Sequence, residues 1–282
     1  MALDIKPFVK WAGGKKQLLN QLIPKIPKQY NTYYEPFIGG GALLFAVQPK
    51  HAIINDVNEQ LLNVYRHLKQ DAEPVIKKVR QLDSRPCDKD FYLQTRARYN
   101  EKIAVHELDA ECAALMIWIN KHCFNGLYRV NSKGLFNVPF NNSKKINSVS
   151  PDNLRNIHDY LSSYDIEIKQ GDFEEACKDI KAGDFVYFDS PYVPVSATAS
   201  FTSYTKDGFT AADHQRLADL YRKLDNIGVK VMLSNNNVPE VHELYKGFNI
   251  EAFDVHRAIN SNASKRSGCE VIITNYTISS EE

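Results

Sequence analysis

The sequence predicts an α/β protein in which a doubly wound, mainly parallel sheet is interrupted by a long helical insertion. Short apolar runs alternate with helical patterns in the first 56 residues and again from Ile166 onward. Between Val57 and about Val149, apolar residues instead recur at helical spacing, and strand patterns almost disappear. With 282 residues and 43% hydrophobic content, the chain is large enough to bury one substantial core.

The N-terminal part predicts a βαβ unit. Strands are expected at 33–37 and 52–56, with the turn Gly39-Gly40-Gly41 and a short helix at 42–45 between them. Such a turn lets the backbone approach a cofactor, and Asp56 at the next strand end can accept hydrogen bonds from ribose hydroxyls. No G-x-G-x-x-G or G-x-x-x-x-G-K-[ST] motif for a pyrophosphate is present. A triple glycine alone is also compatible with an ordinary turn.

Upstream of this unit, aromatic and basic residues surround two glycines just before a helix expected near Lys16. The segment reads Phe8-Val9-Lys10-Trp11-Ala12-Gly13-Gly14-Lys15-Lys16. The glycines permit close approach of a ligand at a helix start, and Trp11 offers a flat face. The alternative is an N-terminal strand followed by a solvated lysine pair.

The insertion predicts helices on two periodic apolar sets, Leu61, Leu62, Tyr65 and Leu68, and Cys112, Leu115, Met116 and Ile119. From Lys121 to Ser150 there are five basic residues and no acid, interleaved with aromatic residues, a mixture suited to phosphate contact and base wedging. A second acid-free stretch, His256 to Gly268, could grip a nucleic-acid backbone. Each run is also compatible with a solvated basic loop.

The second half of the chain returns to an α/β rhythm, with an expected helix at 211–224 and loops at 196–209 and 259–268. Strands are expected at 166–169, 184–189, 229–234, 248–254 and 270–276.

The strand near residue 188 ends in Asp189-Ser190-Pro191-Tyr192. The carboxylate can accept hydrogen bonds from an amino group, the exposed tyrosine can stack on a flat ring, and Pro191 stiffens the backbone between them. These features are what an enzyme acting on a nucleobase needs. The alternative is a strand that runs into a proline turn with a half-buried tyrosine.

Composition narrows the setting of the protein. The net charge of +1 requires any nucleic-acid surface to be a local excess of basic residues. Five scattered cysteines without a C-x-x-C pair indicate neither a disulfide framework nor a zinc site. No signal-peptide core and no run of about 20 apolar residues is present, so we expect a cytoplasmic protein without a membrane span.

Five motifs, taken together and in order, resemble those of the Dam/DpnII-type DNA adenine-N6 methyltransferases of the alpha group. They are Phe8 to Lys15, Tyr34 to Gly41, Asn55-Asp56, Gly171-Asp172-Phe173 and Asp189 to Tyr192. The resemblance implies a Rossmann-like class I S-adenosylmethionine (AdoMet) methyltransferase sheet formed by residues 1–56 and 150–282. It also implies a target-recognition insertion at 57–149 with a DNA-reading hairpin near 124–140.

The resemblance implies AdoMet as methyl donor and no metal, because the sulfonium already activates the methyl group. The implied cofactor residues are Trp11, Lys15, Phe37, Gly39, Asp56, Asp172, Phe173 and Asp189. Among them, Asp56 would hold the ribose, Asp172 the adenine amino group, and Phe173 would pack against the adenine ring. Trp11 and Lys15 would lie near the methionine and adenosine portions.

The substrate implied by the resemblance is double-stranded DNA, with single strands possible, and the target is the adenine of GATC. Arg129 would bond a guanine edge, Phe124 and Leu127 would wedge into the opened duplex, and Lys10 would approach the first base pair. The implied DNA-binding residues are Lys10, Phe124, Asn125, Leu127, Arg129, Asn131 and Pro139. A restriction enzyme is a possible genetic partner.

The implied chemistry begins with flipping of the adenine out of the duplex. Asp189 and the main-chain carbonyl of Ser190 would accept the N6 hydrogens, Tyr192 would stack on the base, and Pro191 would hold the turn. The family has Asp-Pro-Pro-Tyr here, so Ser190 is a departure that leaves φ unfixed. A weakly active or inactive AdoMet- and DNA-binding homologue is one alternative. An N4-cytosine enzyme is another, although an acid at 189 favours adenine.

Overall fold

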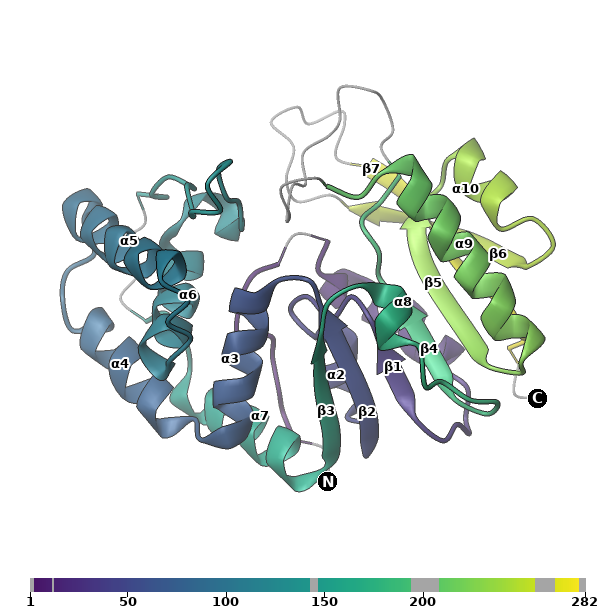
Figure 1. Ribbon diagram of the computed structural model, residues 1–282, viewed down its shortest axis with the longest axis horizontal. Coiled ribbons are helices and arrows are strands. Elements are labelled where there is room, and N and C mark those ends of the chain that lie inside the picture. Colours follow the sequence, from purple (N-terminus) through teal and green to yellow (C-terminus); the bar gives the residue numbers. More distant parts are fainter. Residues whose placement is uncertain (1–2, 12, 143–146, 194–207, 257–266, 279–282) are drawn as a thin grey trace.

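The computed structural model describes residues 3–11, 13–142, 147–193, 208–256 and 267–278. Their centre is a seven-stranded sheet in the order β3-β2-β1-β4-β5-β7-β6 (Figure 1). β1 to β5 are parallel, and β7 runs antiparallel to both of its neighbours. The strands are β1 (Tyr33–Glu35), β2 (His51–Asp56), β3 (Asp165–Gln170), β4 (Phe185–Phe188), β5 (Lys230–Asn236), β6 (Asn249–His256) and β7 (Ser267–Thr274).

Helices cover both faces of this sheet. Along β4, Phe185 and Tyr187 belong to one buried cluster, whereas Val186 and Phe188 belong to another. A strand buried on both faces is typical of parallel sheets. The helices are α1 (Leu19–Leu22), α2 (Ala42–Val47), α3 (Glu59–Gln70), α4 (Glu73–Asp83), α5 (Lys89–Ala104), α6 (Ala110–His122), α7 (Pro151–Ser163), α8 (Phe173–Ala176), α9 (Ala211–Asn226) and α10 (Pro239–Leu244), with 3₁₀ turns at Lys15–Gln17, Ile23–Lys25 and Phe124–Gly126.

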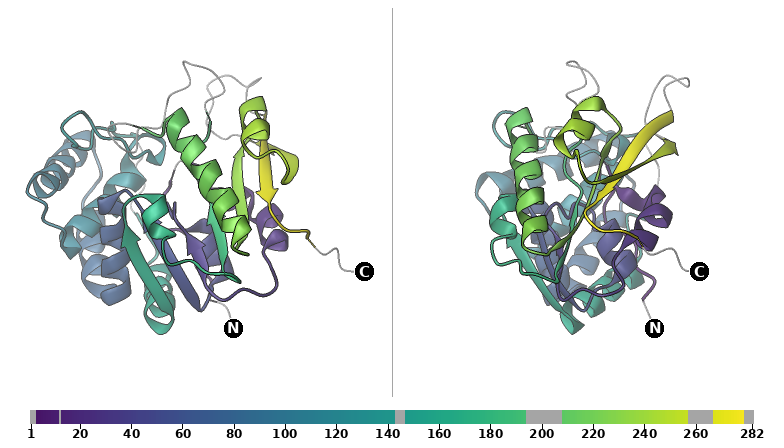
Figure 2. Two further views of the ribbon diagram at one scale, coloured as in Figure 1. Left: turned by 45° about the vertical axis from the view of Figure 1, so that its right-hand side comes forward. Right: turned by 90° about the vertical axis from the view of Figure 1, so that its right-hand side faces the viewer.

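The first cluster lies under α2, α3 and α7, and the second under α8, α9 and α10. Figure 1 shows α8 and α9 in front of β4 and β5. Figure 2 shows the yellow-green β6 and the yellow β7 at the edge of the sheet beyond β5. The two clusters hold the sheet between helices. The parallel strands therefore end at one edge of the sheet, and the side chains that follow them lie together there.

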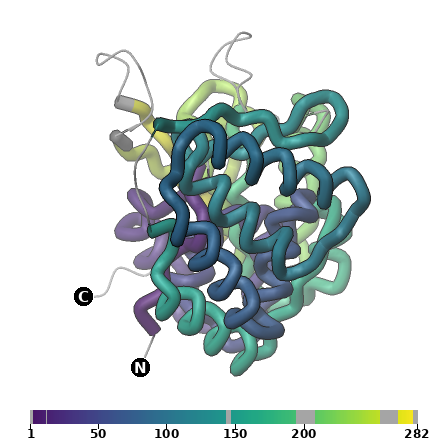
Figure 3. The backbone as a smooth tube through the Cα atoms, turned by 90° about the vertical axis from the view of Figure 1, so that its left-hand side faces the viewer, coloured from purple at the N-terminus to yellow at the C-terminus, as the bar shows by residue number. Residues whose placement is uncertain are grey.

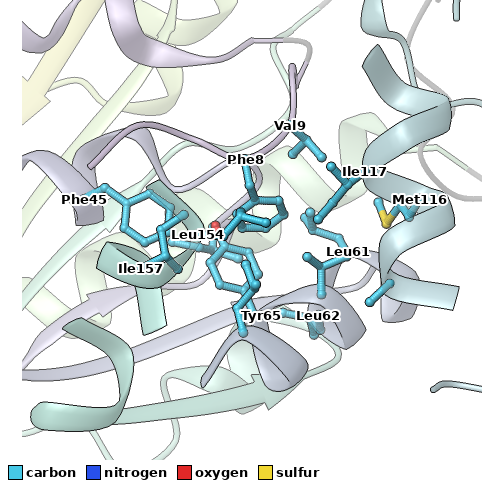
Figure 4. Close-up of a cluster of buried hydrophobic side chains, with 14 of the residues drawn as sticks. Phe8, Val9, Phe45, Leu61, Leu62, Tyr65, Met116, Ile117, Leu154 and Ile157 are labelled. Carbon is cyan, nitrogen blue, oxygen red and sulfur yellow. The ribbon is translucent and has the colours of Figure 1, made fainter. Parts of the chain in front are cut away.

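The helices of the insertion pack on one another at one end of the molecule. Helix α6 contacts α3, α4 and α5, and these helices form the surface seen in Figure 3. Helix α3 also contacts β2 and β3, so it links the insertion to the sheet. In Figure 4 the N-terminal segment joins the same core, because Phe8 and Val9 pack among side chains of α3, α6 and α7.

Polar caps start the insertion helices where the sequence offers them. Asp109 accepts a hydrogen bond from the backbone of Cys112 at the start of α6, and Asn58 does the same for Leu61 in α3. Thr210 and Asp213 form a reciprocal capping box at α9.

No helix among the described residues has the length and apolarity needed to cross a bilayer.

The predicted α/β fold is confirmed, including both strands of the first βαβ unit and the helix at 211–224. Helices α7, α8 and α10 were not located by the sequence pattern. The expected loop at 259–268 is wrong at its end, because Ser267 and Gly268 already pair in β7. The remainder of that loop, and residues 196–207 of the other, lie outside the described residues.

Candidate active site

An ion pair lies at the carboxyl end of β4. Asp189 follows this strand directly, and its Oδ1 pairs with Nζ of Lys15, which also donates to the carbonyl of Gly13 at 2.6 Å. Lys15 is 4% exposed, whereas the side chain of Asp189 is 20% exposed. Burial raises the pKa of Asp189, and the ammonium of Lys15 opposes that rise. The lysine therefore partly offsets the desolvation of the carboxyl group.

Two side chains from neighbouring strands complete this group. Ser234 on β5 donates to Oδ1 of Asp189 at 3.3 Å. The hydroxyl of Tyr192 donates to Oε2 of Glu270 on β7 at 2.6 Å, and its ring centroid lies 4.7 Å from Nζ of Lys15. Tyr192 is half-buried, so the exposed aromatic expected from the sequence is corrected. Glu270 thus contacts the hydroxyl of Tyr192 and Lys15 contacts its ring face, and the two contacts fix the orientation of the ring.

Ser190 is buried at 2% exposure, and its hydroxyl has no hydrogen-bond partner. The chain after Pro191 and Tyr192 is held by β5, since Asn235 accepts from the backbone of Val193 at 3.1 Å. The turn that carries Ser190 is therefore supported from its C-terminal side, although the hydroxyl itself adds no support.

The glycine turn closes over Asp56. The backbone N–H of Gly39 donates to Oδ2 at 3.0 Å, and that of Asn58 donates to Oδ1 at 2.9 Å. Burial raises the pKa of Asp56 to about 6, although these donors lower it. Gly39 has φ of 47°, and a Cβ there would lie 2.8 Å from Cδ1 of Trp11. The indole thus lies directly on the turn, and only glycine fits beneath it.

Aromatic rings gather beside this turn. Phe37 and Phe173 have ring centroids 5.4 Å apart, and the guanidinium of Arg216 lies 4.9 Å from the Phe173 ring. Asp172 caps α8 through the backbone of Glu174 and accepts from Arg216 at 2.8 Å. Flat rings next to an acid, near a buried carboxylate in a glycine turn, fit the adenine and ribose of a nucleoside cofactor.

The predicted hairpin is present, with antiparallel bridges between Val130 and Phe136 and between Cys123 and Phe140. Asn120 fixes it to the N-terminal segment. Its amide exchanges two hydrogen bonds of 2.8 Å with the backbone of Lys10 and donates to the carbonyl of Gly126 at 2.9 Å. A Cβ on Gly126 would lie 2.6 Å from that of Lys10, so the two backbones meet closely.

Six of the seven residues expected to bind DNA are exposed, namely Lys10, Phe124, Asn125, Arg129, Asn131 and Pro139. Phe124 is 51% exposed although it is a large apolar side chain. Nε of Arg129 donates to Oδ1 of Asn137 at 2.7 Å. The Oδ1 of Asn131 accepts from two backbone N–H groups of the hairpin loop, so this side chain shapes the loop. Leu127 is half-buried against the core.

The structure brings the expected cofactor and catalytic residues to the carboxyl ends of β1, β2, β3 and β4. The hairpin lies on the side of α5 and α6, across from β5 and α9 (Figure 1). Sequence reasoning missed Ser234, Glu270 and Asn120, and it named Tyr128 only as one of the aromatic residues of the basic run. The position of Ser234 at the end of a predicted parallel strand could have indicated it, whereas Glu270 depends on the antiparallel pairing of β7. In the second acid-free stretch, His256 to Gly268, residues 257–266 lie outside the described residues.

No group of three or more His, Cys, Asp or Glu side chains in the described part of the chain is arranged to hold a metal ion. All five cysteines carry free thiols.

Comparison with known proteins agrees with this geometry. Residues 11–259 match the model of the D12 class N6 adenine-specific DNA methyltransferases. A Type II methyltransferase of Lactococcus lactis subsp. cremoris is 43% identical over 97% of this chain and 96% of its own. A Type II methyltransferase of Methanocaldococcus jannaschii is 41% identical over 97% of this chain and 100% of its own.

A DNA adenine methylase of Escherichia coli is 29% identical over 96% of this chain and 95% of its own. The family match covers most of the sheet and all of the insertion, and it implies DNA as substrate and AdoMet as methyl donor. The chain belongs to the D12 class of N6-adenine-specific DNA methyltransferases.

Proposed function

We propose that the protein transfers a methyl group from AdoMet to N6 of a flipped-out adenine in the sequence GATC of double-stranded DNA. The observation that carries this proposal is Asp189 at the end of β4, paired with Lys15 and adjacent to Tyr192. An acceptor for an amino group and a flat ring for a base stand together there. Asp56 and the glycine turn follow two neighbouring strands at the same rim.

The base must leave the duplex at a cost of a few kcal/mol. Stacking on Tyr192 offsets part of this cost, because a base on an aromatic ring is worth about 1 to 3 kcal/mol. Lys15 and Ser234 both contact Oδ1 of Asp189, so Oδ2 accepts a hydrogen bond from one N–H of N6. The carbonyl of Ser190 accepts the other. The lone pair of N6 then leaves conjugation and points at the methyl group, and orientation supplies much of the acceleration.

AdoMet supplies an electrophilic methyl group when bound. We assign its ribose to Asp56, its adenine to Phe37, Asp172 and Phe173, and its remaining contacts to Trp11, Lys15 and the backbone at Gly39. The contact of Trp11 with Gly39 and the 5.4 Å pairing of Phe37 with Phe173 support this assignment.

We assign target recognition to residues 57–149 and catalysis to 1–56 and 150–282. The exposed side chains of Phe124 and Arg129 on one hairpin support this division. In the major groove, an arginine such as Arg129 can contact the edge of a guanine through two hydrogen bonds. The relatives named Type II methyltransferase support a restriction enzyme as genetic partner.

Ser190 motivates the second candidate, a weakly active or inactive homologue. Its buried hydroxyl is unpartnered, and its backbone lacks the restriction that proline provides. We favour retained activity because the accepting groups are the carboxylate of Asp189 and a backbone carbonyl, neither of which depends on the side chain at 190. The class of the family favours adenine over N4 of cytosine.

The test is transfer of label from AdoMet to DNA. Duplexes containing GATC or the rearranged site GTAC, and single strands of the GATC oligonucleotide, are incubated with enzyme, and the hydrolysed DNA is analysed by mass. We expect N6-methyladenine in the GATC duplex only, and none with Asp189→Ala. Equal methylation of both duplexes would reject GATC. N4-methylcytosine, or no transfer at high enzyme concentration, would reject the adenine reaction.

A further inference from the structure

Tyr128 lies on the proposed DNA-reading hairpin between Leu127 and Arg129, yet its side chain contacts Trp11 at the proposed cofactor site. The residue is 8% exposed. Its ring stacks on Trp11, with centroids 5.5 Å apart and planes inclined by 30°. The ring therefore contacts the indole that lies on the glycine turn.

The hydroxyl of Tyr128 makes a second link to the same region. It lies 3.5 Å from the hydroxyl of Tyr99, and side-chain hydrogen bonding from Asn58 acts on it as well. Asn58 donates its backbone N–H to Asp56 at 2.9 Å and caps α3. Burial raises the pKa of Tyr128 to about 12, so the hydroxyl stays protonated at neutral pH.

These contacts form one packed chain from the hairpin to the cofactor turn. Trp11 has no free space toward Gly39, since even a Cβ there would lie 2.8 Å from the indole. Close-packed contacts of this kind transmit displacement rather than absorb it. A ligand that moves the backbone at Arg129 also moves the ring of Tyr128, and with it Trp11 and Asn58.

We propose that Tyr128 is a positioning residue that couples recognition of the DNA sequence to the affinity of the cofactor site. The inference rests on the proposed function, because it needs both ligands at their assigned places. Binding of the cognate duplex orders the hairpin and tightens the cofactor site through the Trp11 stack and the Asn58 link. Linkage makes the effect reciprocal, so the cofactor tightens cognate DNA by the same factor.

The experiment measures binding of S-adenosylhomocysteine, an unreactive probe, with and without saturating GATC duplex. The ratio of the two dissociation constants is the coupling factor, for which we expect roughly five- to 150-fold in the wild type. Tyr128→Leu removes the ring and should bring the coupling factor to about one. Its affinity for the probe should change less in the absence of DNA than in the presence of saturating GATC duplex. Tyr128→Phe keeps the stack and loses the hydroxyl, so its factor should lie at least about twofold below the wild type and above that of Tyr128→Leu.

Tyr245→Leu is the matched control, because Tyr245 is a buried ring in the other cluster and should leave the coupling factor unchanged. A wild-type factor in Tyr128→Leu overturns the inference, as does coupling lost equally in Tyr245→Leu. If Tyr128→Leu does not fold, an unchanged factor in Tyr128→Phe overturns it. Failure of the wild type to bind the probe refutes the proposed function, whereas probe binding without coupling to DNA refutes the role of Tyr128 alone.

Discussion

At the scale of single residues, Lys15 favours the charged form of the acid at the strand end. Desolvation raises the pKa of Asp189, and the buried ammonium beside it opposes that rise. A carboxylate accepts hydrogen bonds through both oxygens, whereas a protonated acid also presents a donor. Lys15 thus favours the form of Asp189 that the proposed hydrogen bonds from N6 require.

Removing this ammonium should shift the pH dependence of methyl transfer. In Lys15→Met the pKa of Asp189 loses its lowering partner and rises further, so the carboxylate forms only at higher pH. At saturating AdoMet, kcat should therefore fall at a higher pH on the acid side than in the wild type. The exposed neighbour gives a matched control, and Lys16→Met should keep the wild-type profile. An unshifted acid limb in Lys15→Met would contradict this role.

Ser190 separates the effect of backbone restriction from that of the hydroxyl. Ser190→Ala removes a buried group without a partner and should raise the free energy of unfolding by about 1 kcal/mol with little change in kcat. Ser190→Pro fixes φ and should raise kcat roughly two- to fivefold, the equivalent of about 0.4 to 1 kcal/mol. Thermal unfolding and single-turnover assays measure the two effects. A rate increase in the alanine variant equal to that in the proline variant would assign the effect to the hydroxyl instead.

The residues of the site differ in how far the sequence could predict them. Asp189, Tyr192 and Asp56 could be proposed because each lies at or just after the end of an apolar run that becomes a strand. Glu270 was not, because its contact with Tyr192 exists only through the antiparallel register that places Asn236 opposite Glu270. Apolar alternation predicts a strand and says nothing about its neighbour or direction.

At the scale of elements, the hairpin holds Arg129, the residue that we propose contacts a guanine, in a defined orientation. Asn137 on the returning strand accepts from Nε of Arg129 through its side chain at 2.7 Å and from Nη2 through its backbone carbonyl at 3.4 Å, which holds the guanidinium against that strand. The same element uses Asn131 internally to close its loop. An arginine restrained in this way loses less rotational freedom when it contacts a base.

Arg129→Ala should relax sequence preference more than it weakens overall binding. We expect a loss of about 1 to 3 kcal/mol of discrimination at one guanine position, since a bidentate contact to a base edge is removed. Binding to GATC and to singly substituted duplexes is compared at fixed salt. Lys133→Ala, an exposed lysine on the same loop, is the control and should weaken all duplexes alike. A uniform loss with Arg129→Ala would make it a phosphate contact.

Elements were predicted best where a pattern is long and regular. Helices α3 and α6 carry apolar residues at steady helical spacing, and both were identified. Helices α8 and α10, of four and six residues, are too short to show a period. Helix α7 has a serine cap and Pro151 at its start, features that could have revealed it.

At the scale of the whole molecule, an acid is buried within the sheet. Glu35 ends β1 at 2% exposure, and the hydroxyl of Tyr33 donates to it at 2.7 Å. Burial raises the pKa of Glu35 to about 8, although this hydrogen bond lowers it. The folded protein therefore holds a proton that the unfolded chain releases near pH 4.5.

This acid should make stability depend on pH. Because the pKa in the folded state is the higher one, its contribution is fully present below about pH 4.5 and is lost as the pH rises to about 8. Glu35→Gln keeps an acceptor for Tyr33 and has no such dependence. The gain in free energy of unfolding of Glu35→Gln over the wild type should therefore be larger at pH 8 than at pH 5. Urea unfolding at both values measures it, and equal gains would contradict the assigned burial.

The order of the strands could not be read from the sequence pattern alone. Alternating strands and helices predicted a parallel sheet, which β1 to β5 form. The insertion of β7 between β5 and β6 is a tertiary choice, because no local pattern distinguishes an antiparallel strand buried among parallel ones. The helical insertion was predicted because its period changes at Val57.

The contact of Gly126 with Lys10 has a consequence for protein engineering. Lys10 belongs to the segment that carries Trp11, so position 126 cannot accept a side chain without disturbing the segment to which we assign methyl-donor contacts. Variation aimed at a new target sequence should instead be confined to the exposed positions 129 and 139, with Gly126, Asn120 and the loop-closing Asn131 kept fixed. A randomised library built on this rule would change what the enzyme reads while preserving the chemistry that it performs.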